Sequence, residues 1–147
     1  MNRSASARHT KQPSTPAVIE VTLHNGLRWQ VGEGHDDLIQ PSGVDGFNLG
    51  SCPNAERVKH NAQRDVWRVR IGECEYFAKL YHPAGPFAVA KVLMRGPTAL
   101  REWAVGTYAQ SHGISAVVPV AAAWSQDRLS AQPSLLVTAA VGSALPL

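Results

Sequence analysis

Apolar and polar residues alternate with the period of a β-strand in several parts of the chain. Residues 18–31 alternate on both sides of Asn25-Gly26, a pair that favours a tight hairpin turn because both residues tolerate positive φ. The alternation returns at residues 66–71 and 76–81, on either side of a turn at Gly72-Glu73. The pattern therefore predicts an N-terminal hairpin and, after a connector, a second pair of strands.

Three further strands are predicted from less regular patterns. Residues 56–59 form a short one. Residues 114–124 are apolar and β-branched around Pro119, which is typical of an edge strand or a bulged strand because proline has no N–H to donate. Residues 134–141 are a continuous apolar run, as expected of a buried strand.

The main helical pattern lies between these strands, at residues 98–112. It begins after Gly96-Pro97, since proline is favoured in the first helical turn, and ends before Gly113. Residues 87–95 predict a shorter, basic amphipathic helix, and a helical turn is expected near residues 36–40. Two interpretations of the segment 87–95 stay open: packing beside the following helix, or contact with a membrane surface or an acidic partner.

The order of these elements predicts an α+β fold. We expect a twisted antiparallel sheet of about five strands with one main packed helix, preceded by a separate hairpin. Residues 1–16 are polar and contain Ser, Thr and Pro, which predicts a disordered tail. Residues 17–54 would then hold the hairpin and a linker, and residues 55–147 the main domain.

Composition narrows the class of protein. The net charge of +3 comes from the tail, because after it 11 basic residues balance the 11 acidic ones, so no nucleic-acid partner is expected. Two cysteines do not make a disulfide scaffold, and no cluster has the spacing of metal ligands. No apolar run reaches the length of a membrane span, and the tail lacks the apolar core of a secretory signal. These features predict a cytoplasmic protein; peripheral contact with the inner membrane face stays open.

Lys79 and Glu102 are the strongest candidates for chemistry. Lys79 interrupts an apolar strand, where a buried ammonium group is costly unless an anion meets it. Glu102 follows on the main helix, after a connection long enough for that helix to pack back on the sheet. A lysine on a strand that pairs with a glutamate on a helix is the arrangement with which protein kinases hold nucleotide phosphates. The alternative is an edge lysine whose ammonium reaches water and a solvated glutamate near a helix N-terminus.

Four segments of the chain carry a series of motifs: EYFAKLY, KVLMRGPTALREW, HGISAVVPVAAAW and SLLVTAAVGSALPL. The most specific is the block of Arg95-Gly96, Ala99 and Glu102-Trp103. Over residues 56–147 the chain resembles the lipopolysaccharide kinase family, which includes the Kdo and heptose kinases. The resemblance implies a protein kinase-like fold, of which this chain holds the N-lobe.

The resemblance also implies roles for individual residues. Lys79 would contact ATP, with Glu102 as its helix partner, and the backbone of Ala139 to Val141 would form the hinge that meets the adenine. The segment in place of the Gly-rich loop contains no glycine, so Asn61 and Arg64 would have to help hold the nucleotide. ATP and Mg²⁺ are the cofactors expected of an intact relative.

Catalytic carboxylates are missing from the remainder of the sequence. A kinase needs a catalytic-loop Asp, an Asn and a second, metal-binding Asp, whereas residues 103–147 contain Asp127 alone and no Asn. We therefore expect the nucleotide-binding lobe of a phosphotransferase, inactive alone, in a truncated or split protein whose C-lobe is missing or separate. The alternative is a non-catalytic, pseudokinase-like module that binds or regulates a partner.

Overall fold

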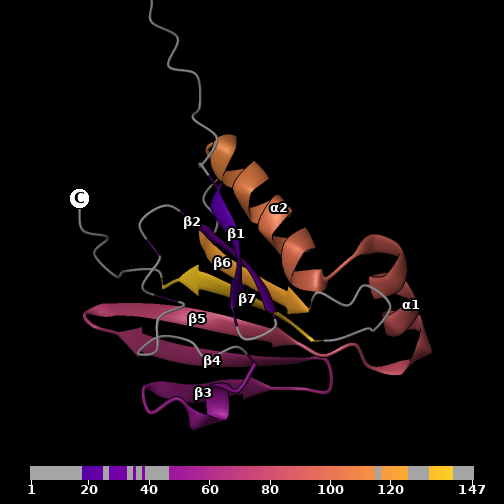
Figure 1. The fold of residues 1–147 in the computed structure, drawn as a ribbon, viewed down its shortest axis with the longest axis horizontal. Coiled ribbons are helices and arrows are strands. Elements are labelled where there is room, and N and C mark those ends of the chain that lie inside the picture. Colours follow the sequence, from indigo (N-terminus) through magenta and orange to yellow (C-terminus); the bar gives the residue numbers. More distant parts are fainter. Residues whose placement is uncertain are drawn as a thin grey trace, which may run out of the picture.

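The protein has an α+β fold with one antiparallel β-sheet and, in the described part of the chain, two α-helices (Figure 1). This computed structural model describes residues 18–24, 27–32, 35, 38, 47–114, 117–125 and 133–140, with the backbone alone for residues 18–24. The strands are β1 (Val18–His24), β2 (Leu27–Gly32), β3 (Ala55–His60), β4 (Arg64–Ile71), β5 (Cys74–Tyr81), β6 (Pro119–Ser125) and β7 (Ser134–Ala139). The helices are α1 (Gly85–Arg95) and α2 (Thr98–Ser111), and a short 3-10 helix spans Leu49–Ser51.

All seven strands belong to one sheet, in the order β1-β2-β6-β7-β5-β4-β3. The prediction of a separate N-terminal hairpin is corrected by the pairing of β2 with β6, which runs from Leu27↔Ser125 to Val31↔Ala121. The physical reason is burial: Trp29 and Val31 of β2 belong to the main core. The strand pairing therefore crosses the boundary that was expected between residues 54 and 55.

The alternation in β4 and β5 assigns side chains to opposite faces of the sheet, as predicted. One face carries the main core, where Val69 of β4 lies among Tyr76, Ala78 and Leu80 of β5. On the other face α2 covers the sheet, and its Ala99 and Trp103 form a second cluster with β6 and β7. Figure 1 shows α2 running obliquely over the β6 and β7 side of the sheet.

The two helices differ in how closely they pack. The predicted main helix is confirmed as α2, and Gly113 beyond its end has a φ of 69°. A Cβ atom added at Gly106 of α2 would lie 3.0 Å from Cδ of Pro119, so the helix passes close to the start of β6. The helix α1 follows β5 at the end of the sheet, and none of its residues is buried (Figure 1).

Strand β6 is an interior strand, not the edge strand that was one of its two predicted forms. It lies between β2 and β7, and its register with β7 shifts between Pro119 and Ala121, an irregularity of the kind expected of the bulged form. Proline is tolerated there because it is the first residue of the strand. The expected tail at residues 1–16, most of the helical turn at residues 36–40, and Asp127 lie outside the described residues.

Candidate functional site

Lys79 lies on the face of the sheet that α2 covers. It is paired in register with Leu136 of β7, whose side chain packs against α2, and partners that are directly opposite in an antiparallel sheet share a face. Its side chain is half-buried. Among the described residues Lys79 makes no ion pair and no side-chain hydrogen bond. A cation in such a position lacks the anion that would compensate its partial desolvation.

Glu102 does not meet Lys79. Its side chain is exposed on α2, and it makes no ion pair with any described residue. Glu102 nevertheless lies close enough to the end of β5 to act on Tyr81. Burial raises the pKa of the Tyr81 hydroxyl, and the negative charge of Glu102 raises that pKa further. The two predicted partners therefore lie on the same side of the sheet without the expected ion pair, because the turn of α2 that buries Trp103 directs Glu102 towards solvent.

Asn61 has a structural role in the turn between β3 and β4. Its side-chain Oδ1 accepts hydrogen bonds from the backbone N–H groups of Gln63 (2.9 Å) and Arg64 (2.7 Å). Its own N–H donates to the carbonyl of Arg64 (3.0 Å). The segment that was expected in place of the Gly-rich loop, residues 59–65, is thus mostly strand, and only a tight turn separates β3 from β4. In that turn an asparagine side chain replaces backbone turn contacts. This Oδ1 is occupied by the turn, which leaves only the amide N–H donors of Asn61 for a ligand.

Arg64 shares a sheet face with Lys79. It is paired in register with Tyr81, and Val66, two residues further along β4, is paired with Lys79. Its positive charge opposes the rise in the pKa of Tyr81. The Nε–H of Arg64 is buried, and the described part of the chain offers it no hydrogen-bond partner. Arg64 and Lys79 are therefore the two predicted site residues that the fold places together.

The expected hinge is only partly described. Ala139 ends β7, and its N–H donates to the carbonyl of Val118 (3.1 Å), while the N–H of Ala140 donates to the carbonyl of Glu75 (3.1 Å). These two donors are used within the protein, so they are not free to meet an adenine ring in this conformation. Val141 lies outside the described residues.

A cluster of His60, Asp65 and His82 was missed by sequence reasoning. Asp65 is buried, and its carboxylate accepts hydrogen bonds from Nδ1 of His60 and from Nε2 of His82 (3.1 Å). The hydrogen bond from His60 and the second one from His82 hold the pKa of Asp65 below its ordinary value, against the effect of burial. The signal was present in the alternation, because Asp65 is in phase with Trp67 and Val69, on the core face.

Comparisons with known proteins do not assign this chain to a family. No family model matches the chain, and no curated protein or solved structure matches it significantly.

Within the described ranges, no group of three His, Cys, Asp or Glu side chains is placed to hold a metal ion. Neither α1 nor α2, the helices of the described part, has the length and apolar character of a membrane span.

Proposed function

We propose that this chain is the nucleotide-binding lobe of a kinase-like phosphotransferase related to the lipopolysaccharide kinases, and that it is inactive alone. In an intact relative, ATP with Mg²⁺ would phosphorylate a sugar or lipid-linked sugar hydroxyl. One observation carries the proposal: Lys79 is a half-buried cation for which no described residue provides an anion, on the sheet face that a helix covers. Phosphate oxygens are anions of the kind that such a lysine holds in kinases.

The surroundings of Lys79 are consistent with a phosphate site. Arg64 adds a second cation on the same face, one strand away. Glu102 lies on α2, which would correspond to the helix with which a kinase holds its lysine, and a movement of Glu102 towards Lys79 on ligand binding would complete the pair. A binding-induced closure of this kind is typical of catalytic sites, whose hydrogen bonds are often long or absent without substrate.

A second candidate function is a non-catalytic module that binds a partner protein. The N–H groups of Ala139 and Ala140 donate to carbonyl groups of the protein, so the expected hinge cannot use these two donors to bind adenine. This observation favours a function without nucleotide binding. Under this proposal Lys79 would meet a carboxylate of the partner instead of a phosphate. The two candidates differ in whether ATP alone stabilises the protein.

Thermal unfolding with Mg-ATP tests the leading proposal. The melting temperature of the wild type is expected to rise, because a ligand at a concentration of 100 times its Kd stabilises the folded state by about 2.7 kcal/mol. Lys79→Ala is expected to remove this rise. Arg28→Ala is the control, because Arg28 is an exposed cation on β2, which lies three strands away from β5 in the sheet.

Two results would count against the proposal. An equal rise in melting temperature for the wild type and Lys79→Ala would show that ATP binds elsewhere. No rise in any variant, together with capture of an acidic partner that depends on Lys79, would favour the non-catalytic module. ATP-dependent phosphoryl transfer by the chain alone would contradict its proposed inactivity.

A further inference from the structure

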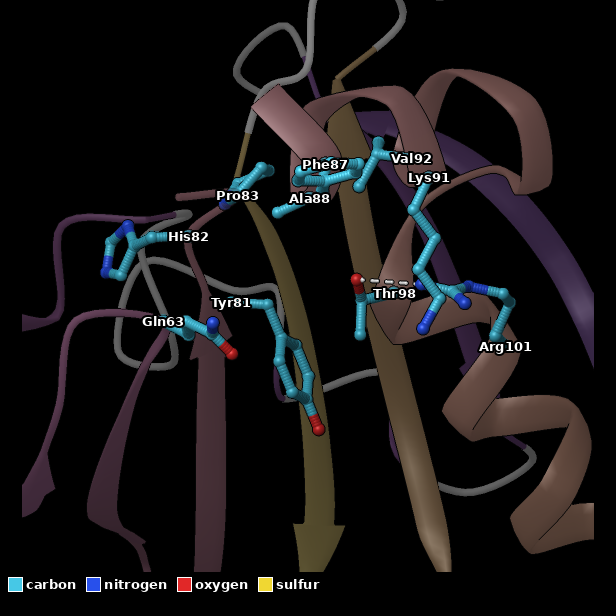
Figure 2. A pocket seen from close by; sticks show the side chains of 10 residues that line it. All are labelled: Gln63, Tyr81, His82, Pro83, Phe87, Ala88, Lys91, Val92, Thr98 and Arg101. Carbon is cyan, nitrogen blue, oxygen red and sulfur yellow. Dashed lines mark hydrogen bonds between the residues drawn. The ribbon is translucent and has the colours of Figure 1, made fainter. Parts of the chain in front are cut away.

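A cavity of about 360 Å³ opens where β5 ends, between α1 and the first turn of α2. Figure 2 shows its lining side chains, which come from the β3–β4 turn, the end of β5 and the two helices. The polar members include Lys91, Thr98 and Arg101, and the apolar members include Phe87 and Val92. Lys79 does not line this cavity, so a ligand bound here would occupy a site separate from the proposed nucleotide site.

Two cations from different helices converge in the cavity. Figure 2 shows the side chains of Lys91 of α1 and Arg101 of α2 directed towards the same region, beside Thr98. Nη2 of Arg101 donates to Oγ1 of Thr98 (3.3 Å), whereas the Nε–H of Arg101 is buried and has no hydrogen-bond partner among the described residues. Like charges so placed repel each other, and a buried donor without an acceptor is costly. Both costs are relieved by an anion.

Among the residues that the structure describes, no carboxylate lines the cavity to provide that anion. Residues 76–101 contain neither Asp nor Glu. The carboxylate of Asp65 is occupied by hydrogen bonds from His82 and His60. Glu102 follows Arg101 in α2, but it is exposed and makes no ion pair with Arg101 or Lys91 within the described residues.

We propose that this cavity binds a phosphate monoester. A guanidinium group and an ammonium group supply several charged N–H donors to one oxyanion, and the Thr98 hydroxyl supplies a further donor if it turns towards the ligand. The apolar wall of Phe87, Ala88 and Val92 would contact the organic part of the ester. Phe87 is 90% exposed, and an exposed aromatic side chain beside the cavity would contact the acyl region of a membrane. The phosphate headgroup of a lipid is therefore a second source of the same ligand chemistry.

Calorimetric titration with inorganic phosphate, at constant ionic strength, tests the cavity. The wild type is expected to bind phosphate, and Lys91→Gln and Arg101→Lys are each expected to weaken binding about tenfold, the loss of one charge-assisted hydrogen bond. Arg95→Gln is the matched control, since Arg95 is exposed on the same helix as Lys91 but does not line the cavity. Thermal melts without ligand establish that each variant is folded.

Co-sedimentation distinguishes the two sources of the ester. Phosphatidylcholine vesicles are compared with and without phosphatidic acid, whose headgroup is a phosphate monoester. Binding to phosphatidic acid that requires Lys91 and Arg101, and that weakens in Phe87→Ala, supports a lipid source, whereas binding of inorganic phosphate alone supports a soluble one.

The proposal is overturned by either of two results. One is the failure of the wild type to bind inorganic phosphate and phosphatidic acid vesicles. The other is phosphate binding that Lys79→Ala abolishes and that Lys91→Gln and Arg101→Lys leave unchanged, because the phosphate would then lie at the lysine of β5. Failure of the ATP experiment alone leaves this test intact, since the two sites share no residue.

Discussion

Asp65 illustrates how one residue can follow the apolar alternation and still be charged. It occupies a core-facing position of β4 at the end of the sheet, where an uncompensated carboxylate would be costly. His60, paired in register with Asp65, and His82, which follows β5, both donate to it. The carboxylate therefore joins three consecutive segments of the sheet at the end where the proposed phosphate cavity opens.

This cluster predicts a pH dependence of stability. Since the pKa of Asp65 is lower in the folded protein than its ordinary 3.8, its contribution is present above about pH 3.8 and is lost as the pH falls towards the lower folded value. Asp65→Asn is expected to reduce the free energy of unfolding at pH 7 by about 1–3 kcal/mol. In urea denaturation series, the difference between the variant and the wild type should shrink below pH 3.8. A difference that stays constant down to about pH 2 would contradict the assigned role of the carboxylate.

At the scale of elements, the contact between α2 and the sheet depends on small residues. Ala99 is fully buried beneath the helix, and Gly106 lets the helix backbone approach the Pro119 ring at the start of β6. Trp103, between them, fills the space above Ala122 and Leu136. The small residues Ala99 and Gly106, on either side of Trp103, therefore allow α2 to lie close to the sheet.

Gly106→Val is expected to destabilise the protein by about 1–3 kcal/mol, because the added atoms would overlap the Pro119 ring. Valine has a higher helix propensity than glycine, so propensity alone predicts the opposite sign. Ala104→Val is the control: Ala104 is exposed on the same helix, and the change should cost about 0.6 kcal/mol through helix propensity. Urea denaturation followed by far-UV circular dichroism measures both. A stabilised Gly106→Val would show that α2 has room to move outwards.

At the scale of the whole molecule, one sheet joins the N-terminal hairpin to the rest of the fold. Trp29 of β2 is fully buried in the main core, together with residues of β4, β5, β6 and β7. The hairpin covers the edge of β6 that would otherwise expose unpaired backbone groups. The described strands therefore belong to one continuous sheet, and strands from both sides of the expected boundary at residues 54 and 55 contribute to one core.

Trp29→Ala tests this continuity. The substitution is expected to lower the free energy of unfolding by about 3–5 kcal/mol, as for a large aromatic residue removed from a core. The loss should affect a single transition seen by circular dichroism and by the fluorescence of the remaining tryptophans. Arg28→Ala, at an exposed position of the same strand, should have little effect. An unchanged main transition would mean that the hairpin folds separately.

Much of the local structure was predictable from the sequence. The period of two located β4 and β5 and their faces, and the glycine and proline residues around residues 96–113 marked the limits of α2. These features depend on interactions between residues near in sequence, which a pattern records directly. The joining of the hairpin to β6 was not predictable, because about 90 residues separate the two strands and both have a pattern that suits an edge or an interior strand.

The candidate site divides in the same way. The sequence by itself determined that Lys79 interrupts an apolar strand and that it shares a face with Phe77 and Tyr81, because side chains alternate along any strand. Only the tertiary structure decided that Glu102 is directed to solvent, that Asn61 closes a turn, and that Lys91 and Arg101 meet at one cavity. Each of these depends on the rotation and position of a helix or turn against the sheet, which long-range packing sets.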